Sequence, residues 1–505
     1  MRLRRVLAII GVVVLLLCMC CAGAGVWIWN AQVISTADQV DFTRPLAVPP
    51  LAPSRMEAGR RVFDLKAQAG EHDFGRGATP TWGFNGDFLG PTLRAARGEQ
   101  VVVNVTNALD QTTTVHWHGM HLPAETDGGP HQLVGAGKTW SPTWKIDQPA
   151  ATLWYHPHLH GETAGHVYRG LAGMFLVDDP ATSVAALPHE YGVDDIPLIV
   201  QDKKFDSGGK LDDSSSFLGG VGVLGDTVAV NGTVGPYLDV TTERVRLRLL
   251  NGSNARSYEF GFPDGRRFAL VGTDGGLLES AYDTDRIMLS PGERAEIVVT
   301  VRPGERTVLR SYPQPLETGL LGDRFTGGAD TLDILQLRAA GTLATRPAVP
   351  QRLVGMPRLN RGDAVQQRPF KLSGHAINGR QMDMTRVDAA PERGSVEIWK
   401  VVNNDGTPHN FHIHDVQFQV LTRGGAAPPP QLSGWKDTVY LPPNVTFELI
   451  MRFSDYADAD TPYMFHCHVL YHEDSGMMGQ FVVVPPGGKP GVVDHASHLA
   501  HGAHH

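Results

Sequence analysis

The sequence predicts an all-β protein of three tandem β-sandwich domains that follow an N-terminal hydrophobic leader. The first observation is an internal repeat of about 147 residues, which occurs three times in the 505-residue chain. The second is a series of short segments with the period-2 alternation of strands, separated by turns that draw on 57 glycines and 35 prolines. The third is that hardly any long stretch has the 3.6-residue period of a helix, which favours sandwiches.

The leader comprises residues 1–37. Arg2, Arg4 and Arg5 precede an uncharged stretch that runs to Asp38. Its apolar run is longer than the 7–15 residues typical of a signal peptide and matches the ~20 residues that span a membrane. We therefore expect an exported, extracytoplasmic protein, and an uncleaved membrane anchor is the favoured interpretation. Cleavage near Ala22–Ala24 would give a secreted or periplasmic form, and the arginine pair fits a twin-arginine export signal.

An Asn-Gly turn opens each copy of the repeat, and a strand that ends at another asparagine follows. The opening asparagines are Asn85, Asn231 and Asn378, spaced by 146 and 147 residues, and the closing ones are Asn107, Asn251 and Asn403. A second pair of similar segments supports the same alignment: LSPGERAEIVVTV (289–301) matches LPPNVTFELIMRF (441–453). The repeat places the domains at residues 55–180, 190–342 and 365–486, before a histidine-rich tail at 487–505.

Composition excludes some classes of protein. The formal net charge is -9 and no basic patch is present, so a nucleic-acid partner is not expected. Three of the four cysteines, Cys18, Cys20 and Cys21, lie in the leader. Cys467 is therefore alone in the body of the chain, and no disulfide can form within a domain.

Histidines recur at matching positions of the first and third copies. Nine residues after the closing asparagine, these copies carry a His-x-His motif, whereas the second copy carries Phe260-Gly261-Phe262. Further along, the first and third copies each carry another His-x-His, and no histidine occurs between His189 and His375. The eight histidines are His116, His118, His156, His158, His412, His414, His466 and His468.

Alternate residues of a strand face the same side, so each His-x-His motif directs two imidazoles toward one point. We expect the first and third domains to share a site of eight imidazoles, and the second domain to hold no metal. Imidazoles without paired carboxylates favour copper over magnesium or calcium, and zinc remains possible on ligand type alone.

The side chain of Cys467 points to the opposite face of its strand from those of its two histidine neighbours. Two histidines, one cysteine and a weakly bound methionine are the ligand set of blue-copper electron-transfer sites. The sequence therefore predicts a second metal site that is linked to the first through adjacent residues. Its candidate ligands are His409, Cys467, His472 and Met477.

Four motifs, HWHG (116–119), WYHPHLHG (154–161), HNFHIH (409–414) and HCHVLYHEDSGMM (466–478), resemble those of the multicopper oxidases. These are proteins of three cupredoxin-like Greek-key sandwiches, and the resemblance covers roughly residues 55–485. It is strongest to bacterial copper-efflux cuprous oxidases and spore-coat laccases. It implies four copper ions: one type 1 copper at the cysteine site, and one type 2 copper and two type 3 coppers at the imidazole site. The implied type 2 ligands are His116 and His412, and the implied type 3 ligands are His118, His156, His158, His414, His466 and His468.

The resemblance also implies an activity, namely one-electron oxidation of a small donor coupled to four-electron reduction of dioxygen to water. Asp127 and Glu473 occupy the positions of the family's proton-relay acids, and Cys467 is the electron-transfer ligand. Asp405 matches one carboxylate of the family's substrate-copper site, but Thr407 stands where the family has a methionine. The favoured donor is a metal ion, Cu(I) above others, with a role in copper tolerance, and a laccase-like phenol oxidase is the alternative.

Two further classes stay open. One is a copper-free scaffold, as in relatives that serve in cell division but lose the ligand residues, which this chain keeps. The other is a copper carrier without turnover. We expect a monomer, and we hypothesise that the tail binds copper outside the membrane. Its histidines are His495, His498, His501, His504 and His505.

Overall fold

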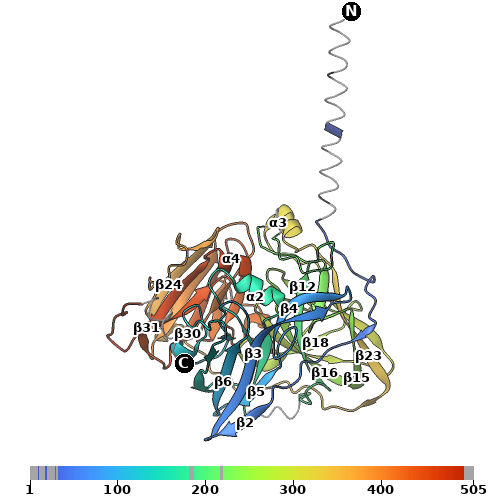
Figure 1. The fold of residues 1–505 in the computed structure, drawn as a ribbon, viewed down its shortest axis with the longest axis horizontal. Helices are drawn as coiled ribbons and strands as arrows, with labels where there is room; N and C mark the ends of the chain where they lie inside the picture. Colours follow the sequence, from blue (N-terminus) through green and yellow to red (C-terminus); the bar gives the residue numbers. More distant parts are fainter. Residues whose placement is uncertain are drawn as a thin grey trace, which may run out of the picture.

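Six β-sheets pair to form three sandwiches that follow one another along the chain (Figure 1). The structure is a computed structural model, and it describes residues 32–180, 187–215, 220–314 and 316–493, together with four isolated leader residues. The predicted all-β class with three tandem domains is confirmed. Apart from those four residues, the predicted anchor lies outside the described residues, as do the tail histidines. Within the described part of the chain, no helix is both long enough and apolar enough to cross a membrane.

The first sandwich packs a six-stranded sheet against a four-stranded sheet. The six-stranded sheet contains β2 (Ser54–Glu57), β3 (Arg60–Asp73), β4 (Ala78–Phe84), β6 (Gln100–Asn107), β8 (Thr139–Trp140) and β9 (Thr143–Lys145). The four-stranded sheet contains β5 (Leu93–Ala96), β7 (His116–His118), β10 (Ala151–His156) and β11 (Gly173–Asp178). The short helices of this sandwich are η1 (Ala124–Thr126) and α2 (Thr163–Arg169).

The second sandwich has the largest sheets. One contains β12 (Asp195–Lys203), β13 (Thr227–Val230), β14 (Thr233–Val234), β16 (Arg244–Asn251), β18 (Phe268–Thr273), β19 (Gly276–Thr284) and β21 (Arg294–Thr300). The other contains β1 (Arg44–Pro45), β15 (Pro236–Thr242), β17 (Tyr258–Gly261), β20 (Arg286–Leu289), β22 (Arg306–Ser311) and β23 (Leu332–Ala344). Helix α3 (Gly319–Phe325) follows β22. Strand β1 precedes the first sandwich in sequence yet pairs with β15, so this segment belongs to the second sandwich.

The third sandwich contains nine strands. Its five-stranded sheet has β24 (Ala364–Ser373), β25 (Ala376–Ile377), β26 (Val396–Asn403), β28 (Phe418–Arg423) and β30 (Thr446–Arg452). Its four-stranded sheet has β27 (His409–Ile413), β29 (Thr438–Leu441), β31 (Asp458–His466) and β32 (Met478–Val483). The helical elements are η3 (Arg361–Asp363), η4 (Pro430–Leu432) and α4 (Leu470–Asp474).

The asparagines that open each repeat form the same turn in all three sandwiches. Asn85, Asn231 and Asn378 have positive φ angles of 58°, 50° and 52°, a conformation that asparagine tolerates better than most residues. Each side-chain amide donates to a carbonyl of the neighbouring strand, at 2.8–2.9 Å, and each amide oxygen accepts a backbone N–H from that strand, at 2.7–2.9 Å. The local chemistry of asparagine therefore explains the regular spacing of the repeat.

The asparagines that close the repeat strands also act alike. The side-chain nitrogens of Asn107, Asn251 and Asn403 each donate to two backbone carbonyls at 2.7–3.0 Å. All three residues are fully buried, so these bonds satisfy amides that would otherwise cost free energy. The residue nine positions later lies in the other sheet of each sandwich: His116 in β7, Phe260 in β17 and His412 in β27.

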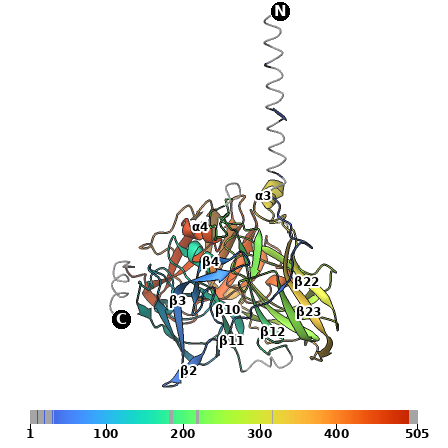
Figure 2. The same ribbon diagram turned by 45° about the vertical axis from the view of Figure 1, so that its right-hand side comes forward.

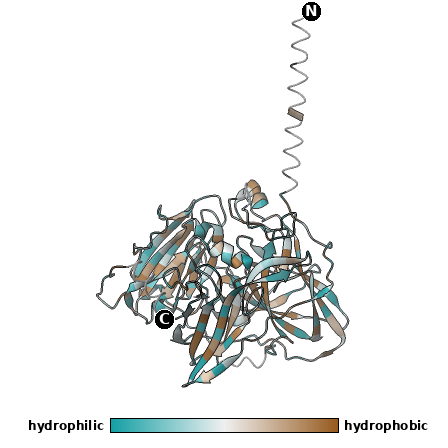
Figure 3. Cartoon of the chain, in the orientation of Figure 1, coloured by the Kyte–Doolittle hydropathy of each residue, from teal (hydrophilic) through white to brown (hydrophobic). Residues whose placement is uncertain are grey.

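Each sandwich has its own hydrophobic core. Along β6, buried and half-buried residues alternate strictly, and Figure 3 shows apolar and polar residues alternating along the strands. The third core includes Cys467 and Met477, both fully buried. The first and third sandwiches also meet through helices α2 and α4, which lie near one another in Figure 2. There the Asp474 carboxylate accepts the backbone N–H groups of Thr163 and Ala164, both at 2.9 Å.

Candidate metal centre

Two pairs of antiparallel strands carry the His-x-His motifs to one buried place. In the first sandwich, His116 of β7 lies opposite His156 of β10. In the third, His412 of β27 lies opposite His466 at the end of β31. The two sheets bring these strand ends together, and the imidazole rings of His118 and His412 stack at a centroid distance of 3.7 Å across the boundary. All eight histidines are 0–1% exposed.

The structure groups six of these histidines into two triads, each with three ring nitrogens within 4.8 Å of one another. One triad is His118, His156 and His468, and the other is His158, His414 and His466. Both triads draw ligand candidates from the first and third sandwiches. In the second triad the Nε2 atoms of His158 and His466 are 3.1 Å apart, and those of His414 and His466 are 3.3 Å apart.

The two remaining histidines, His116 and His412, each leave one ring nitrogen without a hydrogen bond. In each ring Nδ1 lies 2.9 Å from a backbone carbonyl, that of Asp127 for His116 and that of Asp437 for His412. Nδ1–H therefore donates, and the buried Nε2 atoms carry lone pairs with no hydrogen-bond partner. Together with His118, they also form a group within 4.8 Å.

Hydrogen bonds also select the free nitrogen in the triads. Nδ1 donates to a backbone carbonyl in His156, at 2.8 Å, and in His466, at 3.1 Å. In His414, Nδ1 donates to the Asp127 carboxylate at 2.7 Å, so each of these rings presents Nε2 as a lone pair. His118 is reversed: Nε2 lies 3.1 Å from an Asp437 carboxylate oxygen, and Nδ1 faces His156.

These contacts provide a test of whether a metal fits. The lone pairs of His414 and His466 face each other at 3.3 Å, which is repulsive unless a cation lies between them. Burial and the neighbouring histidines lower the pKa of His118, His156 and His414 well below the ordinary value, which keeps the imidazoles neutral. Neutral, hydrogen-bond-oriented imidazoles are the form that binds transition metals, so this donor set fits copper.

A separate cluster surrounds Cys467, which directly follows β31. The Cys467 Sγ atom lies 3.6 Å from Nδ1 of His409 and 3.7 Å from Nδ1 of His472. The two Nδ1 atoms are 3.0 Å apart, and the three residues form a buried group of potential ligands. Met477 is also fully buried, and its carbonyl accepts the Cys467 N–H at 3.1 Å. A thiol and two imidazoles match the soft ligand set of a copper electron-transfer site.

The outer nitrogens of this cluster have different partners. Nε2 of His472 lies 2.9 Å from the Gly220 carbonyl, and Nε2 of His409 lies 3.2 Å from Asp405. Burial alone would lower the pKa of His409, but Asp405 and Cys467 outweigh it and raise the pKa to about 9. The Asp405 side chain is 23% exposed and connects the cluster to the surface. Its oxygens also accept the backbone N–H groups of Gly374 and Thr407.

Two buried carboxylates stand beside the second triad. Glu473 is 1% exposed, and its oxygens lie 3.1 Å from Nδ1 of His466 and 3.6 Å from Nδ1 of His158. Asp127 is also 1% exposed, and it contacts His414 at 2.7 Å and His116 at 3.4 Å. The two acids predicted from sequence thus flank the same group of imidazoles.

Sequence reasoning missed three residues that support these clusters, two by direct contact and one through a neighbour. An Asp437 carboxylate oxygen lies 3.1 Å from Nε2 of His118, and the Arg294 guanidinium donates to Asp437. Asn410 accepts the backbone N–H of His468 at 2.6 Å. Asn410 lies inside the HNFHIH motif, and its position between two candidate ligands could have indicated a role at the site. Asp437 and Arg294 have no such signal, because they reach the site only through the tertiary fold.

Among the described residues, no other histidine belongs to these groups of potential ligands. His160 is exposed, and His166 is buried against the first sandwich, where burial lowers its pKa to about 4. His131 is buried as well, with Nε2 2.9 Å from Gln480. His121 lies between two carboxylates, Asp415 at 2.7 Å and Asp455 at 2.6 Å.

The second sandwich contributes no histidine to the groups of potential metal ligands found among the described residues. Phe260 and Phe262 occupy the positions that correspond to the first His-x-His motif, and both are fully buried in the core of that sandwich. The apolar rings replace a metal site with ordinary packing.

Comparisons with known proteins agree with this arrangement. Three family models, each described as multicopper oxidase, match residues 66–182, 203–308 and 351–487. The chain is 37% identical over 455 residues to the cell division protein FtsP of Xenorhabdus nematophila, covering 88% of this chain and 93% of that protein. It is 36% identical over 436 residues to the multicopper oxidase mco of Staphylococcus haemolyticus, covering 84% and 89% respectively.

A solved structure extends the similarity to the fold. The laccase-like multi-copper oxidase CueO from Ochrobactrum sp., which has oxidase activity towards lignin model compounds, superposes with a TM-score of 0.80 at 37% identity. The match covers 87% of this chain and all of the other. With three matching domains, the shared fold and buried clusters of copper-type ligands, this chain belongs to the multicopper oxidase family.

Proposed function

We propose that the protein is an oxidase that takes single electrons from a small donor and reduces dioxygen to water. It would hold four copper ions: a type 1 copper at Cys467, His409, His472 and Met477, a type 2 copper at His116 and His412, and a type 3 pair at the two triads. Bound copper would supply the one-electron redox chemistry that the side chains of this chain lack.

The observation that carries this proposal is the position of Cys467 between His466 and His468. Its sulfur belongs to one cluster, and its two neighbours belong to different triads. A few covalent bonds therefore connect the sulfur to both triads, which is a short path for electrons. A copper carrier would have no need of such a link between two buried sites.

Reduction of one dioxygen to two waters consumes four electrons and four protons. Glu473 and Asp127 are the buried acids nearest the triads, and their carboxyl oxygens would hold and deliver protons there. Almost complete burial keeps bulk water from the imidazoles, so protons have to arrive through such groups. Cys467 serves as the electron-transfer ligand in the same scheme.

We place the electron donor at the surface beside Asp405. This carboxylate is the partly exposed group that contacts a histidine of the sulfur cluster, and it is suited to attract a cation. The favoured donor is Cu(I), with oxidation to the less toxic Cu(II) as a route to copper tolerance. Phenols are the alternative donors, and the lignin-related activity of the Ochrobactrum oxidase supports them.

The similarity to proteins named for cell division supports a second candidate, a copper-free scaffold. This chain retains all twelve residues of the proposed ligand set, and ligand nitrogens without other partners would be costly to keep in a scaffold. We therefore rank the oxidase first. We further propose that the protein acts outside the cytoplasm as a monomer, either anchored by its leader or released after cleavage.

The test is oxygen uptake by the copper-loaded protein with Cu(I), Fe(II) or a dimethoxyphenol as the donor. The expected result is rapid uptake with Cu(I), and phenol oxidation that rises when Cu(II) is added and falls in Asp405→Ala. Equal phenol oxidation with and without Cu(II), and in the variant, would favour a simple phenol oxidase. No uptake with any donor would contradict the oxidase proposal and favour the scaffold.

A further inference from the structure

The second sandwich holds no candidate metal ligand among its described residues, yet one of its turns touches the triad of His118, His156 and His468. The turn comprises Ser290–Glu293, between β20 and β21, and Arg294 begins β21. We call Ser290–Arg294 the wedge segment. The wedge segment lies against His468, reaches His118 through Asp437, and contacts the strand that carries His156 at Thr152.

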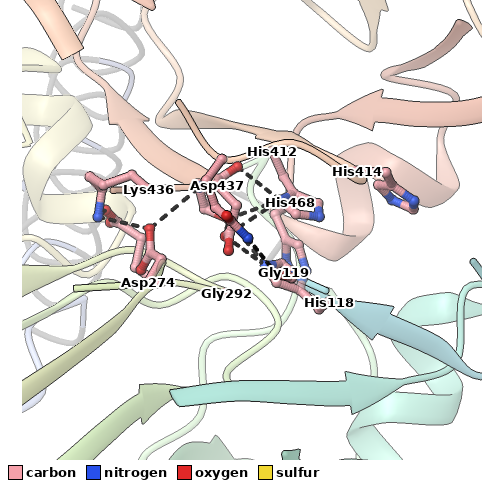
Figure 4. A network of polar contacts seen from close by, with 12 residues as sticks. His118, Gly119, Asp274, Gly292, His412, His414, Lys436, Asp437 and His468 are labelled. Carbon is pink, nitrogen blue, oxygen red and sulfur yellow. Dashed lines mark hydrogen bonds and ion pairs between the residues drawn. The ribbon is translucent and has the colours of Figure 1, made fainter. Parts of the chain in front are cut away.

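Arg294 reaches His118 through Asp437. Its Nη1 and Nη2 atoms donate to the two oxygens of Asp437 at 2.7 and 2.6 Å, a bidentate pair in which both residues are fully buried. The same Asp437 oxygen that accepts from Nη1 lies 3.1 Å from Nε2 of His118. In Figure 4, Asp437 lies between the Lys436–Asp274 pair and the rings of His118 and His412.

This contact decides which nitrogen His118 presents. A proton on Nε2 is held by Asp437 and by the Thr438 hydroxyl at 3.2 Å, so Nδ1 is left as a lone pair. Nδ1 is the atom that faces Nε2 of His156, at 3.4 Å. If Asp437 lost its fixed orientation, the other tautomer and a rotated ring would become accessible, and the triad would lose one ligand atom.

The same arginine touches the strand of the second histidine. Its Nε atom donates to the carbonyl of Thr152 at 3.0 Å, and Thr152 lies in β10, four residues before His156. The surrounding ion pairs are buried as well: Lys436 contacts Asp274 at 2.9 Å and Glu293 at 3.0 Å. The cluster contains three acids (Asp274, Glu293 and Asp437) and two bases (Arg294 and Lys436).

The third histidine, His468, packs directly on the wedge segment. A Cβ atom added to Gly292 would lie 3.1 Å from three atoms of the His468 ring, and Gly292 has a φ of +84°. Asn410 adds a second link, because its Nδ2 atom donates to Ser290 and to the Pro291 carbonyl at 3.1 and 2.8 Å. Its oxygen accepts the His468 N–H, so the wedge segment constrains both the backbone and the ring.

We propose that the wedge segment is a positioning element for one triad of the oxygen-reducing centre, with Arg294 and Gly292 as its positioning residues. The second sandwich is then a structural part of that centre rather than a spacer. This inference rests on the proposed function, since it assumes that the triads hold copper. It predicts that changes in the wedge segment alter metal binding in a cluster to which the second sandwich gives no ligand.

The test compares Arg294→Lys with Arg256→Lys in the full chain. Lysine keeps the charge but cannot form the bidentate pair. Arg256 is a matched control, because it is a buried arginine of the same sandwich whose partners are Asp202, Asp330 and Gly225. A second matched pair is Gly292→Ala and Gly304→Ala, since Gly304 has a φ of +72° with no atom near its added Cβ.

The measurements are copper per chain, the rate of copper loss to a chelator, and the electron paramagnetic resonance spectrum, with thermal stability measured alongside. Arg294→Lys and Gly292→Ala should lose copper from the histidine clusters roughly 10–100-fold faster than their controls and change the spectrum of those clusters. The visible absorption from the cysteine site should keep its wavelength. Equal copper loss and equal spectra in each matched pair would overturn the inference. If the wild-type protein bound no copper at all, the proposed function itself would fail, which is a distinguishable result.

Discussion

Replacing Glu473 by glutamine tests whether a buried carboxyl group supplies protons for the reduction of dioxygen. Glutamine has nearly the same size and shape, so the packing around the triad should survive. Its side-chain oxygen can take the place of the native carboxylate oxygen that lies 3.1 Å from Nδ1 of His466. Its NH₂ group would then face Nδ1 of His158, and one poorly paired buried contact costs about 1–3 kcal/mol of stability.

The effect on the reaction should be larger than the effect on stability. A positioned general acid contributes roughly 10²–10⁴-fold to a rate, which corresponds to about 3–5 kcal/mol of the activation barrier. Glu473 is 1% exposed, so bulk water cannot easily replace it as a proton source. We therefore expect turnover with oxygen to fall by at least about 100-fold, while electron entry at the cysteine site stays unchanged.

The assay separates these two steps. Anaerobic mixing with a donor bleaches the visible absorption of the cysteine site, and a later pulse of oxygen restores it. In Glu473→Gln the bleaching should keep the wild-type rate and the recovery should be slow, with copper per chain unchanged. Glu279→Gln is the matched control, because Glu279 is 45% exposed on the second sandwich and pairs with Arg358. Recovery within twofold of the wild type, at full copper content, would refute the proton-supply role.

Two further predictions concern stability. Burial alone would lower the pKa of His121, but Asp415 and Asp455 outweigh burial and raise the pKa to about 10. The ion pairs of His121 therefore stabilise the fold fully below the unfolded pKa of about 6.5. This stabilisation is lost as the pH rises toward 10. His121→Gln should therefore cost about 1–3 kcal/mol at pH 6 and much less near pH 10, measured by calorimetry, and a loss that grew with pH would contradict this reasoning. Phe260→Ala should destabilise the second sandwich by about 3–5 kcal/mol because it leaves a cavity in a fully buried core, yet copper per chain should match the wild type. If the variant lost copper at temperatures where it remains folded, copper binding would depend on this apolar core, and the prediction would be wrong.

Local chemistry explains why much of the fold could be predicted. The asparagines of the Asn-Gly turns and those that close the repeat strands form hydrogen bonds within their own sandwich. The same residues therefore recur at a regular spacing in the sequence. The His-x-His motifs depend on strand alternation alone, and the pattern in two copies against phenylalanines in the third predicted both the shared site and the copper-free sandwich.

The contacts that the sequence could not predict join distant parts of the chain. The segment Leu289–Val301 served only to align the repeat, yet its Gly292 and Arg294 pack behind a histidine triad. Strand β1 pairs with a strand almost 200 residues later, which no periodicity indicates. Such contacts depend on how the sandwiches pack against one another. That packing is decided by the shapes of their surfaces, which the sequence repeat does not reveal.

The most direct test of the account is the copper content and visible absorption of the wild-type protein and of Cys467→Ser. We expect four copper ions per chain and an intense visible band in the wild type. In the variant we expect the band to disappear and one ion to be lost, while the histidine clusters keep theirs. A wild-type protein that binds at most one ion without strong colour, or a serine variant that keeps the band, would contradict the central claim.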